Sequence, residues 1–347
     1  MKLTQYVDFK PLNVDRERHL AYEQTCPPRR FQMIQERALL GIEVEVENIH
    51  DSVDIPYYWT YKEDGSLRNC GAEFTSIPLR SYQVEYAMDF LHKALYANND
   101  PDFSNRTSVH VHLNVRDMTW DQIKVLVLLY SIFERHFFRI AGTKRESSIF
   151  CVPLYKTKQL DNILQLEKHV QRWHKYTAVN CGTIYGTDNV PRFGTIEFRH
   201  LYGTSDTKTV VDWVNSILCL RRAILFYTLP ELIESIKSMN TTSEYMAMYQ
   251  NIFGTYCTLP PKDIEYCISK VKRSLWVSMN GDFLKKRHSN NVLYAFLTTQ
   301  QPKASKLTAA QAKAKVLADL EHMLFAPAGG GIEPPQNWNQ PVKTTIN

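Results

Sequence analysis

An alternation of apolar and charged residues early in the chain is the feature that most restricts its fold. From Leu40 to Val46 every second residue is Leu, Ile or Val, and glutamates fill positions 43, 45 and 47. Successive side chains of a β-strand point to opposite faces of a sheet. The stretch therefore predicts a strand with one apolar face and one carboxylate face, with Glu47 exposed at its end. A half-solvated antiparallel strand has the same pattern, so this stretch alone does not predict a site.

Three later stretches repeat the alternation with polar residues that can take part in chemistry. They cover residues 71–77, 108–115 and 195–201, and their polar members include Glu73, His110, His112, Glu197 and Arg199. If the four strands share one sheet, one face is a hydrophobic core. The other face then carries carboxylates, two histidines and an arginine, and we predict that it is an active site.

Composition indicates a globular protein with ample chain for a buried core. The 347 residues are 44% hydrophobic and 22% charged, and the net charge of +5 is mild. This charge does not indicate a nucleic-acid partner. The seven cysteines are scattered without a C-x-x-C pair, which favours a reducing cytoplasm. No signal-type apolar run or stretch of about 18 apolar residues predicts secretion or a membrane span.

The pattern divides the chain into four segments. Residues 1–37 are polar and irregular, and we expect an extension that docks on the main domain. Residues 38–228 hold all the candidate site residues and form the expected catalytic core. Residues 229–300 are predicted to be a helical annex. Residues 301–347 predict a loosely attached helix near 307–325 and a disordered Pro/Asn/Gln-rich tail.

Local signals place the elements between the strands. Asp64-Gly65 lies between two strand-like runs, which predicts a hairpin with positive φ at the glycine. Thr119 and Gln122 form a capping box before a helix that continues to about Ile140, and a loop with Lys144 and Arg145 follows. Further elements are a helix near 81–97, a helix near 157–172, a strand at 176–181 and a helix after Asp206.

The residue types of the polar face indicate phosphoryl transfer. Residues two apart on a strand are roughly 6.5–7 Å apart, so Glu43 and Glu45 suit two neighbouring ions rather than one. Carboxylates select hard cations such as Mg²⁺ or Mn²⁺, and an arginine can bind phosphate with two hydrogen bonds. Because the sequence has no G-x-x-x-x-G-K-[ST] motif, a nucleotide would have to be held by the metal ions and this face.

The same stretches, in order, resemble the amidoligase family. This family is a branch of the superfamily that contains glutamine synthetase and γ-glutamylcysteine ligase. The resemblance covers roughly residues 38–228, and its matching motifs are residues 41–45, 59–67, 71–79, 108–114, 145, 175–180 and 195–204.

The resemblance implies an α+β fold and a ligase activity. The fold would be a curved, mainly antiparallel sheet of the glutamine-synthetase-like type, with helices packed on its outer face. ATP and two or three Mg²⁺ ions, with Mn²⁺ as a substitute, would occupy the concave face. ATP would phosphorylate a substrate carboxylate, and an amine would then displace phosphate to form an amide.

The resemblance also implies the metal ligands. One ion, between the nucleotide phosphates, would be held by Glu43, His110 and Glu197. A second ion, nearer the substrate carboxylate and the amine, would be held by Glu45 and Glu73.

The remaining matched residues are basic or lie in motifs without an assigned role. His112 and Arg199 would contact phosphate, and Arg199 would stabilise charge on the transferred group. Arg145 matches a basic position suited to the γ-phosphate or the carboxylate. Asp64 and Lys175 lie in matching motifs, but the residues give no role for either.

Three alternatives stand beside the ligase. The first is a catalytically idle relative, and the second is a guanidino kinase. The third is a cupin-like His-x-His oxygenase, which would need a further histidine such as His200, although the alternation places His200 on the core face. For the ligase, the partners are small-molecule or peptide carboxylates and amines, and the sequence permits an oligomer.

Overall fold

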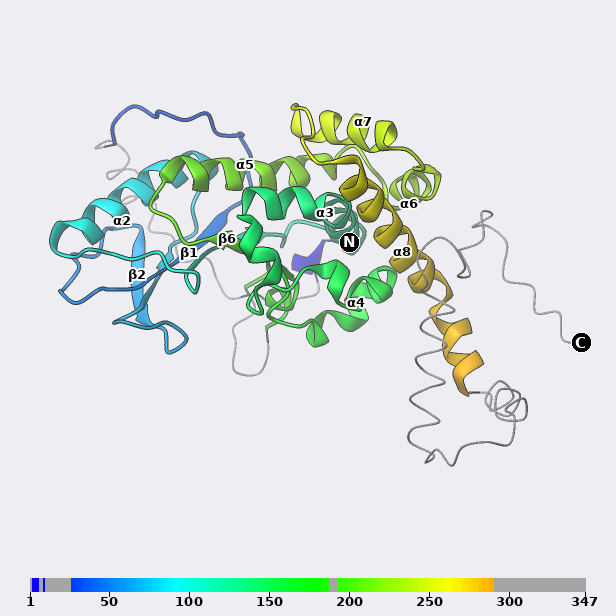
Figure 1. The fold of residues 1–347 in the computed structure, drawn as a ribbon, viewed down its shortest axis with the longest axis horizontal. Helices are drawn as coiled ribbons and strands as arrows, with labels where there is room; N and C mark the ends of the chain where they lie inside the picture. The colour runs from blue at the N-terminus through cyan, green and yellow to red at the C-terminus, as the bar shows by residue number, and fades with distance from the viewer. Residues whose placement is uncertain (1, 6–8, 10–25, 187–192, 290–347) are drawn as a thin grey trace, which may run out of the picture.

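The fold is α+β, built on one open antiparallel sheet (Figure 1). The structure is a computed structural model that describes residues 2–5, 9, 26–186 and 193–289. Within these ranges it has six strands and seven α-helices. The helix expected near residues 307–325 and the tail that follows lie outside the described residues.

The four strands predicted from the alternation lie in this sheet. The spatial order is β2-β3-β1-β4-β6-β5, and every pairing is antiparallel. The strands are β1 (Leu40–Val46), β2 (Trp59–Glu63), β3 (Ala72–Ser76), β4 (Ser108–Asn114), β5 (Val179–Asn180) and β6 (Thr195–Tyr202). β1, β4 and β6, which carry most of the predicted site residues, are therefore adjacent at the centre.

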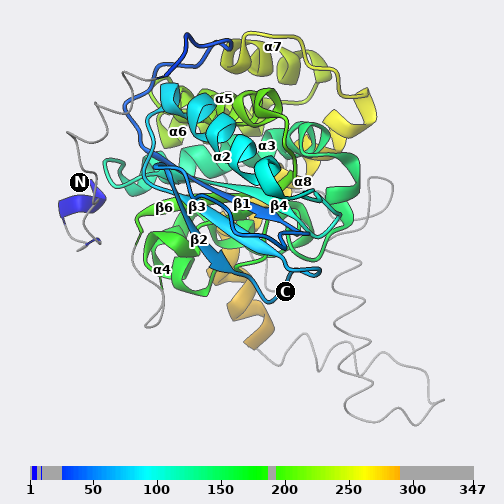
Figure 2. The same ribbon diagram turned by 90° about the vertical axis from the view of Figure 1, so that its left-hand side faces the viewer.

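The apolar residues of the alternation form the core. Ile42, Val44, Val109 and Val111 have no exposed surface. They face the long helices α2 (Val84–Asn98), α3 (Trp120–Ile140) and α5 (Thr207–Ala223). Figure 2 shows these helices on one side of the sheet and the α4 segment on the other. These three helices therefore do not cover the polar face of the sheet, which carries the candidate site residues.

A β-bulge in β6 changes the alternation beside the predicted site. Val111 is paired with Phe198 and Val109 with Leu201, so Arg199 and His200 together lie opposite His110. An extra residue on one strand re-aims the side chains around it. His200 and Leu201 are both fully buried, while Arg199 lines the cavity of the polar face.

Helix caps explain where the long helices begin. Thr119 accepts a hydrogen bond from the Gln122 backbone, and the Gln122 side chain accepts one from the Thr119 backbone, which confirms the predicted capping box. At α5 the Asp206 side chain accepts hydrogen bonds from the amides of Lys208 and Thr209.

The annex is helical where it is described. It contains α6 (Leu229–Ser238), α7 (Thr242–Phe253) and α8 (Pro261–Ser289). Phe133 of α3 packs edge-on against Tyr245 and Tyr249 of α7, with ring centroids 5.1 and 5.6 Å apart. The annex therefore packs against α3 of the helical layer, and α8 also contacts η5 (Leu160–Gln165).

The predicted continuous helix near 157–172 is wrong. The segment contains three short pieces, η5 (Leu160–Gln165), α4 (Leu166–His169) and η6 (Val170–Arg172), with a non-helical Asn162 inside the first. The amide of Leu164 donates to Ser278 Oγ of α8 at 3.0 Å instead of continuing a helix. The remaining 3₁₀ helices are η1 (Leu3–Gln5), η2 (Ser81–Gln83), η3 (Thr143–Ser147), η4 (Leu154–Lys156) and η7 (Gly182–Ile184).

The strand predicted at 176–181 is reduced to β5, two residues long. Thr177 donates its amide to His174 O in a turn, and Ala178 donates to Val152 O. These two amides pair outside the sheet, so the ladder with β6 holds only Val179 and Asn180, although Ala178 O accepts a hydrogen bond from the Arg199 amide of β6.

The predicted hairpin connects β2 and β3, but its loop differs from the expectation. Asp64 Oδ1 accepts a hydrogen bond from the Ser66 amide at 2.8 Å, which closes an Asx turn. Positive φ angles occur at Asn69 and Cys70, not at Gly65. The loop continues to Gly71, so the turn is longer than a tight two-residue connection.

The described part of the N-terminal extension contacts the helices of the core. Glu85 of α2 accepts hydrogen bonds from the amides of Arg30 and Phe31, and Asn215 of α5 accepts one from Ile34. These are the contacts expected of a docked extension. None of the helices in the described ranges combines the length and apolar character needed to cross a membrane.

Candidate active site

The polar side chains of the sheet lie in three rows across its strands. In the first row Glu73 lies between Lys62 and Glu45. In the second row Glu43 lies between Thr75 and His110. The third row pairs His112 with Glu197 and Glu197 with Asn180. Antiparallel neighbours in a row have Cβ atoms about 5 Å apart. The rows therefore bring together the predicted residues of four strands, β1, β3, β4 and β6.

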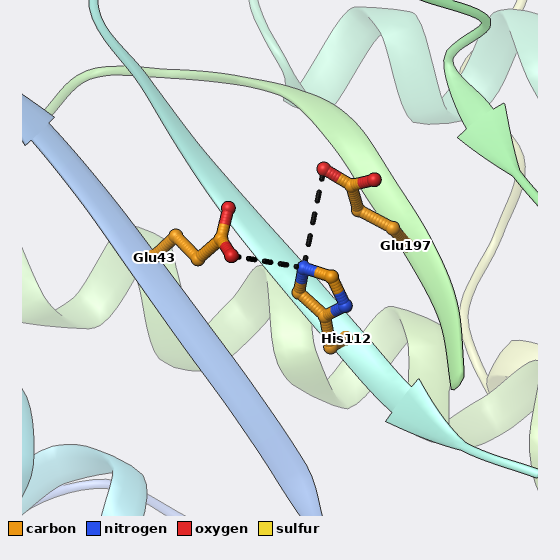
Figure 3. A group of neighbouring side chains, drawn as sticks. All are labelled: Glu43, His112 and Glu197. Carbon is orange, nitrogen blue, oxygen red and sulfur yellow. Dashed lines mark ion pairs between the residues drawn. The ribbon is translucent and has the colours of Figure 1, made fainter. Parts of the chain in front are cut away.

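The first cluster consists of Glu43, His112 and Glu197 (Figure 3). His112 Nε2 is 3.2 Å from Glu43 Oε1 and 3.9 Å from Glu197 Oε1. One ligand atom from each residue lies within 4.8 Å of the others, so the three could hold one ion. All three project from the central strands β1, β4 and β6.

The environment of His112 fits a cation between these groups. Its Nδ1 is 3.1 Å from Thr195 Oγ1, while its Nε2 is buried and makes no hydrogen bond of acceptable geometry. If Nδ1 carries the proton and donates to Thr195, the Nε2 lone pair points at two carboxylates. A second proton or a metal ion would relieve that repulsion.

Charge compensation dominates the ionisation of this cluster. Burial opposes ionisation of Glu43, but His112 and His110 outweigh it and hold the pKa of Glu43 well below its usual range. Burial also opposes protonation of His112, and the Glu43 charge outweighs it and raises the pKa of His112. The pair is thus held in its charged form without an ion.

His110, the predicted metal ligand, lies between the clusters. Its Nδ1 is 3.1 Å from Glu43 Oε2 and 3.5 Å from Glu197 Oε1. Its Nε2 is 2.8 Å from Ser108 Oγ, which donates to Glu45. Both histidines therefore contact Glu43 and Glu197, although only His112 belongs to the first cluster.

The second cluster consists of Glu45, Asp64 and Glu73. Their oxygens also lie within 4.8 Å of one another, and the cluster joins β1 and β3 to the hairpin loop. Lys62 Nζ forms an ion pair with Glu73 at 2.6 Å. Burial and the nearby Glu43 charge raise the pKa of Glu73. Asp64, to which the sequence assigned no role, is the third carboxylate of this cluster.

Arg199 lies beside the first cluster. Its guanidinium forms an ion pair with Glu197, which also accepts a hydrogen bond from Asn180 Nδ2 at 2.8 Å. Burial opposes the charge of Arg199, but Glu197, Glu45 and Glu43 together raise its pKa. The structure thus unites Glu43, Glu45, Glu73, His110, His112, Glu197 and Arg199 on one face.

Arg145 differs from the expectation of a loop residue that contacts the γ-phosphate or the carboxylate. It lies in the 3₁₀ helix η3, is 5% exposed and is not among the residues that line the cavity. Its guanidinium donates to the backbone oxygens of His200 and Arg199 at 3.2 and 3.3 Å. Arg145 therefore contacts the bulge of β6 rather than the open site.

Glu47 also differs from the expectation. It is 2% exposed, not solvated, because the Arg68 amide donates to its Oε1 at 2.7 Å and its backbone pairs with Asp102. It belongs to neither cluster.

The two clusters open into one cavity of about 510 Å³. Several lining residues were not singled out from the sequence: Lys62, Arg106, Ser108, Phe150, Trp173 and Phe193. Lys62 and Ser108 could have been found, because they occupy the polar phase of predicted strands. Trp173 and Phe150 come from irregular segments, where no periodicity marks them.

No model of a known protein family matches the sequence, and no curated protein does. The proposals that follow therefore depend on the site and on the motif resemblance.

Proposed function

We propose that this chain is an ATP- and Mg²⁺-dependent carboxylate–amine ligase that forms an amide through an acyl phosphate. The observation that carries the proposal is the pair of neighbouring clusters, Glu43–His112–Glu197 and Glu45–Asp64–Glu73, with Arg199 beside the first. Adjacent divalent ions and an arginine are the parts that phosphoryl transfer requires. Mn²⁺ would be a substitute for Mg²⁺.

Each of the two clusters would bind a different part of the reacting complex. Bound divalent ions would neutralise the phosphate charge and polarise the transferred group. The first cluster, with His110 against it, would face the nucleotide phosphates. The second cluster would face the substrate carboxylate and the amine, and its Asp64 would complete a set of three carboxylates. In this assignment His112 is a candidate metal ligand as well as a phosphate contact.

Arg199 would stabilise charge on the transferred phosphoryl group. Its ion pair with Glu197 orients the guanidinium before the substrates bind. Arg145 would act through Arg199, because its donors hold the backbone oxygens of the bulge. We therefore assign Arg145 a positioning role rather than direct contact with phosphate.

The wholly antiparallel sheet with one polar face supports a sheet of the glutamine-synthetase-like type. The cupin-like oxygenase alternative would need His200 as a third metal ligand, and the position of His200 argues against that role. His200 is fully buried on the core side, where its Nδ1 donates to Ala178 O at 3.0 Å.

The test is ADP release from Mg-ATP by the full-length protein, with pools of carboxylic acids offered with and without amines. The proposal predicts release that requires both an acid and an amine, and an amide product by mass spectrometry. A phosphorylated guanidinium product would instead indicate a guanidino kinase. Absence of Mg-ATP binding in calorimetry would favour a catalytically idle protein.

A further inference from the structure

The cavity has chemically different ends, because the sheet order separates β5 and β6 from β2 and β3. Near β5 its wall holds aromatic side chains beside the polar Gln171 and Lys175: Phe150 and Tyr176 pack edge-on at 6.1 Å, and Trp173 lines the same side. Near β2 and β3 its wall is polar and includes Asp64, Ser66 and Arg106. The polar end lies beside the second cluster.

Arg106 is held at this polar end by its neighbours. Its Nη2 donates to Ser66 O at 2.5 Å, in the hairpin loop that carries Asp64. Its backbone amide donates to Ser104 Oγ at 3.1 Å. Two residues later, Ser108 Oγ donates to Glu45. The guanidinium is therefore fixed next to the second cluster without belonging to it.

The donors of Arg106 are incompletely used. Its Nε is buried and makes no hydrogen bond. Within the described ranges no carboxylate oxygen comes within 4.0 Å of its guanidinium, whereas Lys62 is paired with Glu73 and Arg199 with Glu197. A buried donor without a partner is costly. A guanidinium facing a cavity matches a planar anion such as a carboxylate.

Arg106 lies before the first residue of β4, the strand that carries His110. Arg106 precedes His110 by four residues, so at most about 14 Å of extended chain separates them. Arg199 lies opposite His110 in the bulge. One substrate of several carbons could therefore place a reacting group near the clusters and a second group at Arg106.

We infer that Arg106 binds a substrate carboxylate that the reaction does not consume. The inference rests on the proposed function and gives it a substrate class: a dicarboxylic acid, or an α-amino acid as the amine. Arg106 would then determine specificity and contribute little to phosphoryl transfer itself.

The first test is calorimetric binding to the full-length protein with Mg²⁺ and a non-hydrolysable ATP analogue. Glutarate is compared with pentanoate for the acid, and alanine with ethylamine for the amine. In one of these pairs the wild-type protein should prefer the compound with the extra carboxylate. Arg106→Gln should reduce that preference on the order of ten- to a hundredfold, the strength of a charged hydrogen bond.

Two controls separate specificity from folding. Arg106→Lys keeps the charge but loses the planar pair of donors, so it should retain part of the preference. Arg222→Gln changes an exposed arginine of α5 that does not line this cavity, and it should bind like the wild type.

The outcomes distinguish this inference from the proposed function. Equal binding within both pairs by the wild-type protein, or an unchanged preference in folded Arg106→Gln, would overturn the role of Arg106. If the preference depends on Arg106 but no amide forms in the ADP-release assay, the binding site stands and the ligase assignment fails.

Discussion

The two faces of the sheet bury similar ionisable groups with opposite consequences. On the cavity side, the Glu43 charge raises the pKa of His112, and the histidines hold the pKa of Glu43 well below its usual range. On the helix side, burial lowers the pKa of His200 to about 3 and raises that of Glu134 to about 7. Residues adjacent in sequence, such as Arg199 and His200, fall on opposite sides of this division.

The two faces differ in the partners that they give to buried carboxylates. Glu134 is surrounded by hydrogen-bond donors from Leu154, Tyr155 and Tyr130, without a cation among them. The cavity carboxylates instead have histidine, lysine and arginine partners that an incoming metal ion could replace. Charge is therefore favoured on Glu43, His112 and Arg199 of the cavity, whereas burial and the Glu43 charge raise the pKa of Glu73. At His200 and Glu134, where packing dominates, charge is suppressed.

The largest expected effect is at Arg199. Arg199→Ala should lower ADP formation on the order of a thousandfold, because arginines that neutralise a transferred phosphoryl group contribute at least that much. The fold should persist, since Arg199 is not part of the core face. The matched control is Arg222→Ala on α5. Activity retained by Arg199→Ala at the wild-type level would remove Arg199 from the site.

The next effect concerns Glu134 and the core face. The pKa of Glu134 rises from 4.5 unfolded to about 7 folded, so the native state keeps a proton that the unfolded state loses. Its stabilising contribution is complete below pH 4.5 and falls as the pH rises to about 7, by about 3 kcal/mol in total.

Glu134→Gln cannot ionise, so its free energy of unfolding should lack this decline. Urea unfolding of both proteins between pH 4.5 and 7.5 measures the difference. Parallel pH profiles for the two proteins would show that Glu134 does not titrate in this range.

A smaller effect is expected at Asp64. Asp64→Asn removes one charge from the second cluster but leaves the first cluster intact, so one class of Mn²⁺ site should weaken about ten- to a hundredfold. The Asx turn with Ser66 can be kept by asparagine, which preserves the loop. Asp121→Asn, at an exposed position on α3, is the control. Weakening of all Mn²⁺ sites alike would argue against two separate clusters.

The smallest effect is the pH dependence of metal binding at the first cluster. A metal ion on His112 must displace the proton that Glu43 favours there. Mn²⁺ affinity should therefore fall as the pH falls through the raised pKa of His112, by at most about tenfold per pH unit. His112→Gln should lose this dependence. An affinity that is independent of pH in the wild type would exclude His112 as a ligand.

The alternation in sequence was sufficient to predict four of the six described strands, their faces and most residues of the candidate site. It works because side-chain direction in a strand depends on local geometry alone. It could not predict the bulge at Arg199 and His200, which arises from pairing with β4. Nor could it predict the buried Glu47 or Arg145, whose partners Arg68 and His200 are distant in sequence.

Contacts between residues that are distant in sequence also limited the prediction of helices. The capping box at Thr119 is a local signal, and it was confirmed. The break at Asn162 accompanies a hydrogen bond from Leu164 to Ser278, 114 residues away. Asp64 had a local signal only for its turn, while its place among the carboxylates depends on the sheet register.

The most direct test of the central claim is to count Mn²⁺ ions bound to the full-length protein with a non-hydrolysable ATP analogue, by electron paramagnetic resonance. If the polar face is a nucleotide–metal site, the wild type should bind at least two ions, one for each cluster. Glu43→Gln should lose one of them while keeping its fold. A wild-type protein that binds no Mn²⁺ with the nucleotide, or a Glu43→Gln variant with an unchanged count, would contradict the account.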